Sequence, residues 1–250
     1  MAAVFTAGVG AGAINSVVGS GTLITFPVLL ATGLPPVTAT VSNALGLIPG
    51  SISGAIGYRE ELRGQRRRVL KLGSGALVGG LAGATLLLML PADAFETIVP
   101  VLVGLALLLV AFQPQIGRLV QRRRARTGAS PRRDGGPLLF GGLTLASVYG
   151  GYFTAAQGII YLSLMGMLLD EPLQRLNGVK NVLAAVVNTF AALFFLFAAD
   201  FEWTAVGLLA VGSGLGGYVG AKVGRRFSPA VLRTLVVTVG TVALVQLLLR

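Results

Sequence analysis

Eight apolar stretches follow one another along this chain, and they constrain its fold more than any other feature. A helix needs about 20 apolar residues to cross a bilayer, and every stretch is about that long or longer. Only 12% of the residues are charged, too few to cover a soluble protein of this size. The sequence therefore predicts an all-α polytopic membrane protein and argues against a soluble enzyme or a nucleic-acid-binding protein. The stretches fall at about 3–31, 37–57, 69–90, 95–112, 138–169, 178–198, 203–221 and 230–249.

Two of the stretches, 3–31 and 138–169, are too long for one comfortable span, and each is interrupted near its middle. The interruptions, around 15–22 and 150–158, are polar and contain glycine. We expect each stretch to form two short helices joined at a polar tip. Such a pair is a broken or re-entrant helical hairpin.

The charged residues predict which loops face the cytoplasm. The net charge is +11, and all basic residues except Arg250 fall in or beside the loops 58–71, 113–136, 170–180 and 222–233. The loops at 91–96 and 199–203 are acidic. The positive-inside rule places the basic loops in the cytoplasm of a multi-pass inner (plasma) membrane protein. The stretch 138–169 must then cross the membrane an even number of times, as a hairpin does.

The two halves of the sequence resemble each other. The glycines at 75, 79 and 83 recur at 212, 216 and 220, a shift of 137 residues, and the same shift places Gly21 on Gly158. Equivalent loops carry opposite charge in the two halves, which indicates an inverted-topology repeat, an arrangement typical of secondary transporters. We expect a first repeat at 1–112, a basic cytoplasmic linker at 113–136 and a second repeat at 137–250. Each repeat would contain one hairpin and three transmembrane helices.

The hairpin tips are the first candidate site. The second helix of each hairpin would begin near Gly21 or Gly158, inside the membrane, and helix N-termini present unpaired N–H groups and partial positive charge. Two such ends meeting at mid-membrane would bind a small anion. The alternative is that small residues here only permit close helix packing. The candidate binding residues at the tips are Asn15, Ser16, Gly19, Ser20, Gly21, Thr22, Tyr149, Tyr152, Thr154, Gln157 and Gly158.

Lys180 is the second candidate, because a cation in an apolar span is costly without a partner. It lies between Asn177 and Asn181 at the start of the span 178–198, and these two asparagines are candidate binding residues with it. Asn43, a polar residue within another span, is a further candidate that would either line the path or hydrogen-bond across helices. Lys180 would supply positive charge to an anion. Alternatively, it extends its side chain to the cytoplasmic interface.

The chain contains no Cys and no His, and none of its acidic residues falls deep within a predicted span. A nucleophile–base set, a metal-binding cluster and a relay of buried carboxylates therefore have no visible residues to form them. We expect a protein that is not an enzyme and that holds no metal ion and no cofactor.

Several segments of the first half resemble the TauE/SafE family of sulfite-exporter-like permeases. They are Gly10-Ala-Gly12-Ala-Ile-Asn15-Ser-Val-Val-Gly19-Ser-Gly21-Thr-Leu-Ile-Thr-Phe-Pro27, then Leu29-Leu30-Ala-Thr-Gly33-Leu-Pro35-Pro36, then Ala39-Thr-Val-Ser42-Asn43, with Tyr58 before a basic loop. The second half matches more loosely, keeping Pro172 but not the double proline. The resemblance implies an inner-membrane permease for sulfite, sulfonates or related sulfur anions, often acting as an exporter. It supplies no catalytic residue.

The sequence thus favours a transporter for a small sulfur-containing anion, bound at mid-membrane between two hairpin tips. Its partners would be that anion and the lipid bilayer, with no nucleic acid, and a homo-oligomer stays open. Two alternatives remain: a permease for another small anion or metabolite, and a membrane scaffold that transports nothing.

Overall fold

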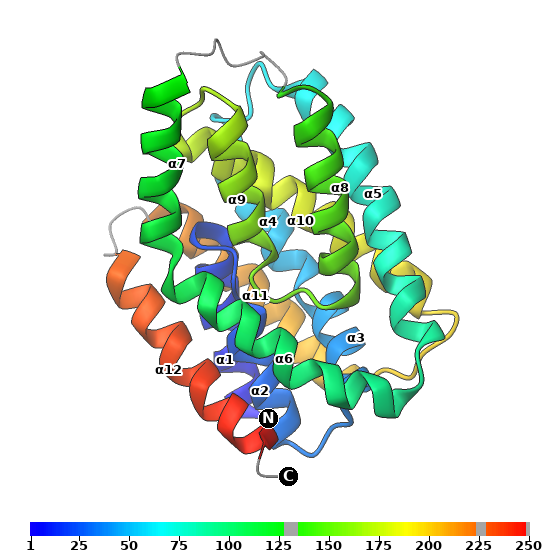
Figure 1. The fold of residues 1–250 in the computed structure, drawn as a ribbon. Helices are drawn as coiled ribbons and strands as arrows, with labels where there is room; N and C mark the ends of the chain where they lie inside the picture. The colour runs from blue at the N-terminus through cyan, green and yellow to red at the C-terminus, as the bar shows by residue number, and fades with distance from the viewer. Residues whose placement is uncertain (128–134, 224–228, 249–250) are drawn as a thin grey trace.

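The computed structural model describes residues 1–127, 135–223 and 229–248, and within them all regular structure is helical (Figure 1). This agrees with the all-α fold class. The helices are α1 (Ala2–Val17), α2 (Thr22–Ala31), α3 (Pro36–Gly46), α4 (Ile48–Gly57), α5 (Arg66–Met89), α6 (Ala92–Ala111), α7 (Gln113–Thr127), α8 (Gly136–Tyr152), α9 (Gln157–Leu168), α10 (Leu173–Phe195), α11 (Trp203–Val223) and α12 (Pro229–Leu248).

Three described helices, α5, α10 and α11, are long and apolar enough to cross a membrane as single segments. A fourth span is formed if α6 and the first part of α7, which meet at a bend of 58°, are taken together. Large apolar side chains on these helices point outward, Val78 and Leu86 on α5 and Val211 and Leu215 on α11 among them. A surface of this kind suits a lipid environment.

Both long stretches are divided into two helices. The first is interrupted at residues 18–21 and the second at 153–156. Gly19 has a φ of 87° and Ala156 a φ of 57°, values in the left-handed region that redirect the chain.

The helices α8 and α9 run antiparallel to each other. The Ser147 hydroxyl lies 2.6 Å from the Tyr161 hydroxyl, and a side chain placed on Gly142 would touch Leu164. A residue late in α8 therefore contacts a residue early in α9, and an earlier residue of α8 contacts a later residue of α9. The chain reverses its direction at the break between them.

Two segments differ from what the sequence predicted: one expected span is divided into two helices, and part of the expected linker is helical. The stretch 37–57 is divided at Leu47 into α3 and α4, because Pro49 lacks an N–H donor and is tolerated only in the first turn of a helix. The first part of the expected linker 113–136 forms the helix α7, which the high helix propensity of arginine and glutamine favours. Residues 128–134 and 224–228, within two of the basic loops, lie outside the described residues.

Each glycine row packs against the first helix of the other half. In α11, a Cβ on Gly212 would lie 2.6 Å from Phe5 O, and a Cβ on Gly220 would lie 2.6 Å from Ala13 O, both in α1. In α5, a Cβ on Gly79 would lie 2.7 Å from the Cβ of Ser147 in α8. Only glycine allows backbones to approach this closely. The two halves of the chain are therefore packed against each other through both glycine rows.

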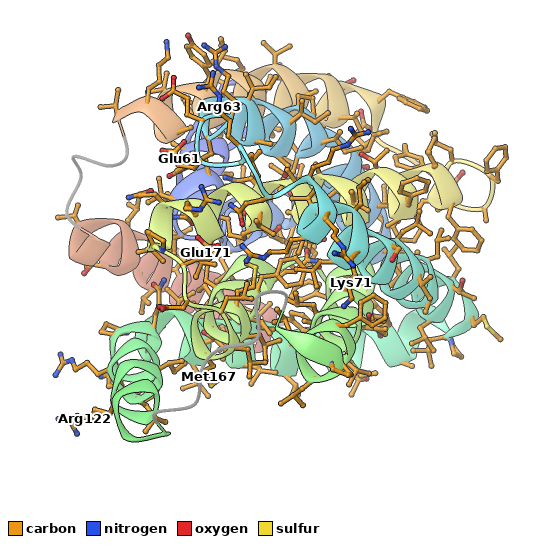
Figure 2. The ribbon with its side chains drawn as sticks, turned by 90° about the horizontal axis from the view of Figure 1, so that it is seen from above. Glu61, Arg63, Lys71, Arg122, Met167 and Glu171 are labelled. Carbon is orange, nitrogen blue, oxygen red and sulfur yellow. The ribbon has the colours of Figure 1, made fainter. Side chains whose placement is uncertain are left out.

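One end of the molecule gathers charged side chains. The loop 58–65, the C-terminal end of α7, the start of α8 and the turn between α9 and α10 lie together at the top of Figure 1, and the turn between α2 and α3 lies at the bottom. Figure 2 looks onto the top end and labels Arg63, Lys71 and Arg122 on different elements there, with Glu171 between them.

Candidate functional site

The two helix breaks touch each other directly. The Gly158 N–H, at the start of α9, donates a hydrogen bond to the Gly19 carbonyl oxygen at 3.1 Å. A Cβ on Gly19 would lie 2.5 Å from the Cα of Gly158, so the contact requires glycine on both sides. The tips of the two long stretches, far apart in sequence, therefore form one junction.

Lys180 of α10 is directed into this junction. Its ammonium donates to the Asn15 carbonyl oxygen at 2.7 Å and to the Ser16 carbonyl oxygen at 3.0 Å. Its aliphatic stem lies against Gly158, where an added Cβ would approach the Lys180 Cδ to 3.0 Å. The last-turn carbonyls of α1 have no partners within the helix, and they carry partial negative charge that suits a cation.

Lys180 is buried, and burial makes its positive charge energetically costly. Its side chain is only 1% exposed. Within the parts of the chain that the structure describes, Lys180 forms no salt bridge. A buried cation without a counter-ion has a high desolvation cost, so an anion that reached this position would be strongly stabilised.

Neighbouring amides complete the junction. Asn181 donates through Nδ2 to the Ser16 carbonyl at 3.1 Å. Asn15 donates through Nδ2 toward the Ser51 hydroxyl at 3.5 Å, and Gly54 packs against Asn181 and Ser16. Ser51 and Gly54 were not predicted from the sequence. The spacing of Gly46, Gly50 and Gly54, the same as in the two glycine rows, is the signal that could have found this face of α4.

Three buried polar atoms near Lys180 and the first tip have no hydrogen-bond partner among the described residues. They are Ser20 Oγ, Asn177 Oδ1 and Asn181 Oδ1. Each of these residues is at most 3% exposed. Because buried polar groups are ordinarily satisfied, these three unsatisfied groups close in the chain to the junction are candidates for binding a polar ligand or an ordered water.

Asn43 belongs to a separate pair of contacts at the start of α2. Its Nδ2 donates to the Thr22 hydroxyl at 3.2 Å, and its Oδ1 accepts from the Thr25 hydroxyl at 2.5 Å. Thr25 was not predicted. These bonds tie α2 to α3, which makes Asn43 and Thr22 structural partners in this conformation.

The second tip is held mainly by its own contacts. The Tyr149 hydroxyl donates to the Ala155 carbonyl at 2.8 Å. Gln157 donates through Nε2 to the Tyr161 hydroxyl at 2.5 Å, and Tyr161 continues this chain to Ser147. The Tyr161–Ser147 pair was also missed, since neither residue lies in the interrupted segment.

Two predicted residues of the second tip lie outside these contacts. Tyr152 packs edge-on against Phe95 of α6, with ring centroids 5.6 Å apart. Thr154 is partly buried.

The helix N-termini are less open than the sequence suggested. The Gly158 N–H is bonded to Gly19, and the N–H groups of Leu23, Ile24 and Thr25 in α2 are bonded within the turn. In this conformation the positive character of the junction therefore comes mainly from Lys180. An apolar groove of about 550 Å³ lies elsewhere, and its lining, which includes Ile52, Ile56, Val182 and Val186, contains none of the predicted site residues.

An ion-pair network lies at the charged end, around the turn between α9 and α10. Glu171 accepts from Arg68 at 2.9 Å and from Arg175 at 2.7 Å. Gln65 adds a hydrogen bond from Nε2 to the Arg175 carbonyl at 3.3 Å. Desolvation opposes the charge on Glu171, but the hydrogen bonds and attraction of the two guanidinium groups outweigh it and hold the pKa of Glu171 below its usual value. The network links α5 of the first half to α10 of the second.

The described residues contain no group of three or more acidic, His or Cys side chains that could hold a metal ion. The polar residues at the junction are amides, hydroxyls and one ammonium.

A comparison with known protein families shows to which family the chain belongs. The family described as sulfite exporter TauE/SafE matches residues 4–247. The chain belongs to the TauE/SafE family. This establishes the protein as a member of a family of membrane transporters, which agrees with its apolar helices.

Curated relatives extend over nearly the whole chain. The probable membrane transporter protein YfcA of Escherichia coli strain K12 is 29% identical over 244 residues, covering 95% of this chain and 86% of the relative. The probable membrane transporter protein ORF9 of a Sinorhizobium species is 28% identical, covering 99% and 92%. A probable membrane transporter protein of Haemophilus influenzae is 26% identical, covering 95% and 90%. No solved structure matches the chain significantly.

Proposed function

We propose that this TauE/SafE protein transports a small sulfur-containing anion, such as sulfite or an organosulfonate, which binds near mid-membrane between the two tips. One observation carries the proposal: Lys180 is a buried cation without a salt-bridge partner among the described residues, at the junction of the two breaks. Charge of this kind inside a membrane protein marks a ligand or ion pathway. The family name supports a sulfur oxyanion in particular.

The unsatisfied groups support the same position for the ligand. Ser20 Oγ can donate to a sulfonate oxygen, while the ammonium of Lys180 supplies charge. The Oδ1 atoms of Asn177 and Asn181 are acceptors, so they would bind an ordered water or a hydroxyl of a protonated oxyanion rather than a bare oxygen.

The proposal includes an inverted repeat with two re-entrant hairpins, α1–α2 and α8–α9. The reciprocal packing of each glycine row on the first helix of the other half supports a pseudo-twofold relation between the halves. The basic loops 58–71, 113–136 and 222–233 would face the cytoplasm. Rocking of the halves about the junction would expose the anion to either side in turn.

The membrane potential gives the direction that the transporter would favour. A negative-inside potential drives anions outward by about 2.3 kcal/mol per charge per 100 mV. Export of a monovalent sulfonate would therefore proceed down its electrochemical gradient.

Anion binding to the purified protein tests this function. Thermal unfolding in detergent is measured with sulfite, ethanesulfonate, acetate or chloride at equal ionic strength. A ligand that binds only the folded state raises the midpoint. We expect sulfite or ethanesulfonate to raise the midpoint in wild type and to raise it less in Ser20→Ala.

A rise with acetate alone would replace the sulfur anion with another small anion or metabolite. If every anion gave the same midpoint as chloride, the proposed site would be wrong, and the scaffold alternative would gain support.

A further inference from the structure

The hydrogen bonds of Lys180 suggest a role beyond attraction of an anion. We infer that the ammonium of Lys180 is a built-in counter-cation that occupies the position of a coupling metal ion, so that anion binding and transport need no added Na⁺ or K⁺. This inference rests on the proposed function, and it states which group balances the charge of the bound anion.

The two carbonyl groups that hold Lys180 have the geometry of a cation site. Asn15 and Ser16 lie in the last turn of α1, directly before the break at 18–21. In secondary transporters, the C-terminal carbonyls of interrupted helices bind the coupling cation. Here the ammonium occupies that position, at 2.7 and 3.0 Å from the two oxygens.

The Ser16 carbonyl has no capacity left for a metal ion. It accepts one hydrogen bond from Lys180 and a second from Asn181 Nδ2 at 3.1 Å. A carbonyl oxygen has two lone pairs, so both are used. A Na⁺ ion at this oxygen would have to displace the ammonium, and placing both cations together would be repulsive.

The ammonium also keeps one N–H free for a ligand. Two of its three donors are directed to Asn15 and Ser16, and the third has no protein acceptor among the described residues. Its stem packs on Gly158, which itself bonds to Gly19, so the charge lies where both tips meet. A single fixed charge can thus contact the anion and the end of α1 together.

Anion flux in proteoliposomes, measured while the external and internal cations are exchanged, tests the inference. Sulfite flux at a fixed pH and potential is compared in Na⁺, K⁺ and choline media. We expect wild-type flux to be equal in the three media within about twofold, because the required positive charge is covalently attached.

Variants of the lysine sharpen the test. Lys180→Ala removes the ammonium and leaves the Asn15 and Ser16 carbonyls exposed to a small cavity. We expect flux to fall by about tenfold or more and to recover in part when methylammonium is added. The recovery is a readout that a purely structural role would not produce. Lys71→Met, which removes an exposed lysine on α5, is the matched control and should respond to neither change.

The outcomes separate the two proposals. Wild-type flux that disappears in choline would overturn the built-in cation while leaving anion transport intact. Lys180→Ala flux equal to wild type, or a loss that methylammonium does not reverse in a variant that still unfolds cooperatively, would overturn it as well. Wild-type flux no greater than in empty vesicles, in every medium, would overturn the proposed function itself and the inference with it.

Discussion

At the scale of residues, a few positions determine the junction between the two halves. Gly19 and Gly158 permit backbone contact, and Lys180 joins α10 to the end of α1. Each of these contacts links segments more than 100 residues apart in sequence. Their loss should therefore affect the whole molecule and not only its neighbourhood.

Gly19→Ala tests the backbone contact. The new Cβ would meet Gly158 at 2.5 Å, and the φ of 87° is unfavourable for alanine. We expect a loss of about 2–4 kcal/mol in unfolding free energy, from left-handed strain and overpacking together. Chemical denaturation in detergent measures it. Gly10→Ala in α1, where an added Cβ has no neighbour within 4 Å, is the control and should be neutral or slightly stabilising. Equal stability of the two variants would contradict the assigned contact.

Lys180 also illustrates what the sequence could and could not predict. The cost of a cation in an apolar span directed attention to residue 180, which the structure places in a buried position. Its partners could not be read from the sequence, because they are backbone carbonyls, which every residue possesses, on a helix 164 or more residues away. The left-handed conformation of Ala156 was equally unpredictable, since alanine carries no preference for it.

At the scale of helices, the glycine rows form close packing faces, which pair α5 with α8 and α11 with α1. The spacing alone could not name the partner helix, because a glycine face accepts any helix of suitable shape. The division of 37–57 at Leu47 was missed although Pro49 signals a helix start, because the stretch is apolar on both sides of the break.

Alanine substitutions at two glycines of α5, one in the glycine row and one outside it, test whether the row packs closely against α8. Gly79→Ala places a methyl group against Ser147, 2.7 Å away, whereas Gly73→Ala in the same helix meets nothing within 4 Å. We expect Gly79→Ala to cost about 1–3 kcal/mol of unfolding free energy. Gly73→Ala should cost nothing or gain a little. If both were neutral, α5 and α8 would not be packed as closely as described.

The Glu171 network predicts a pH dependence. The pKa of Glu171 is lower in the folded protein than its ordinary value, so its contribution to stability is present above the ordinary value and is lost as pH falls through the folded one. We expect wild type to lose stability below the ordinary glutamate pKa, and Glu171→Gln to lack that part of the loss. Thermal unfolding between neutral and acidic pH measures it. Glu60→Gln, which removes an exposed carboxylate in the same region, should retain the wild-type profile; an identical profile for Glu171→Gln would show that the ion pairs contribute nothing.

At the scale of the whole molecule, two features bear on transport. Each glycine row packs against the first helix of the other half, and several segments with charged side chains lie together at one end. Both features are compatible with the proposed inverted repeat, in which equivalent loops face opposite sides of the membrane and the basic loops share one side.

Side-specific labelling of introduced cysteines tests the proposed orientation of the loops in the membrane. The sequence contains no cysteine, so only the introduced thiol can react. Glu60→Cys and Asp200→Cys each introduce one exposed thiol, in a basic and an acidic loop respectively. In intact cells, a membrane-impermeant maleimide should label Asp200→Cys, and it should label Glu60→Cys only after permeabilisation. Labelling of both from the same side would exclude the inverted topology.

Potential-driven efflux from proteoliposomes is the most direct test of the central claim, that an anion crosses the membrane through this protein. Vesicles loaded with sulfite, ethanesulfonate or chloride are given a negative-inside potential, and efflux is followed against vesicles without protein. We expect sulfite or ethanesulfonate to leave faster than chloride, with a rate that increases with the potential. Efflux no faster than from empty vesicles, for every anion and at every potential, would contradict the claim.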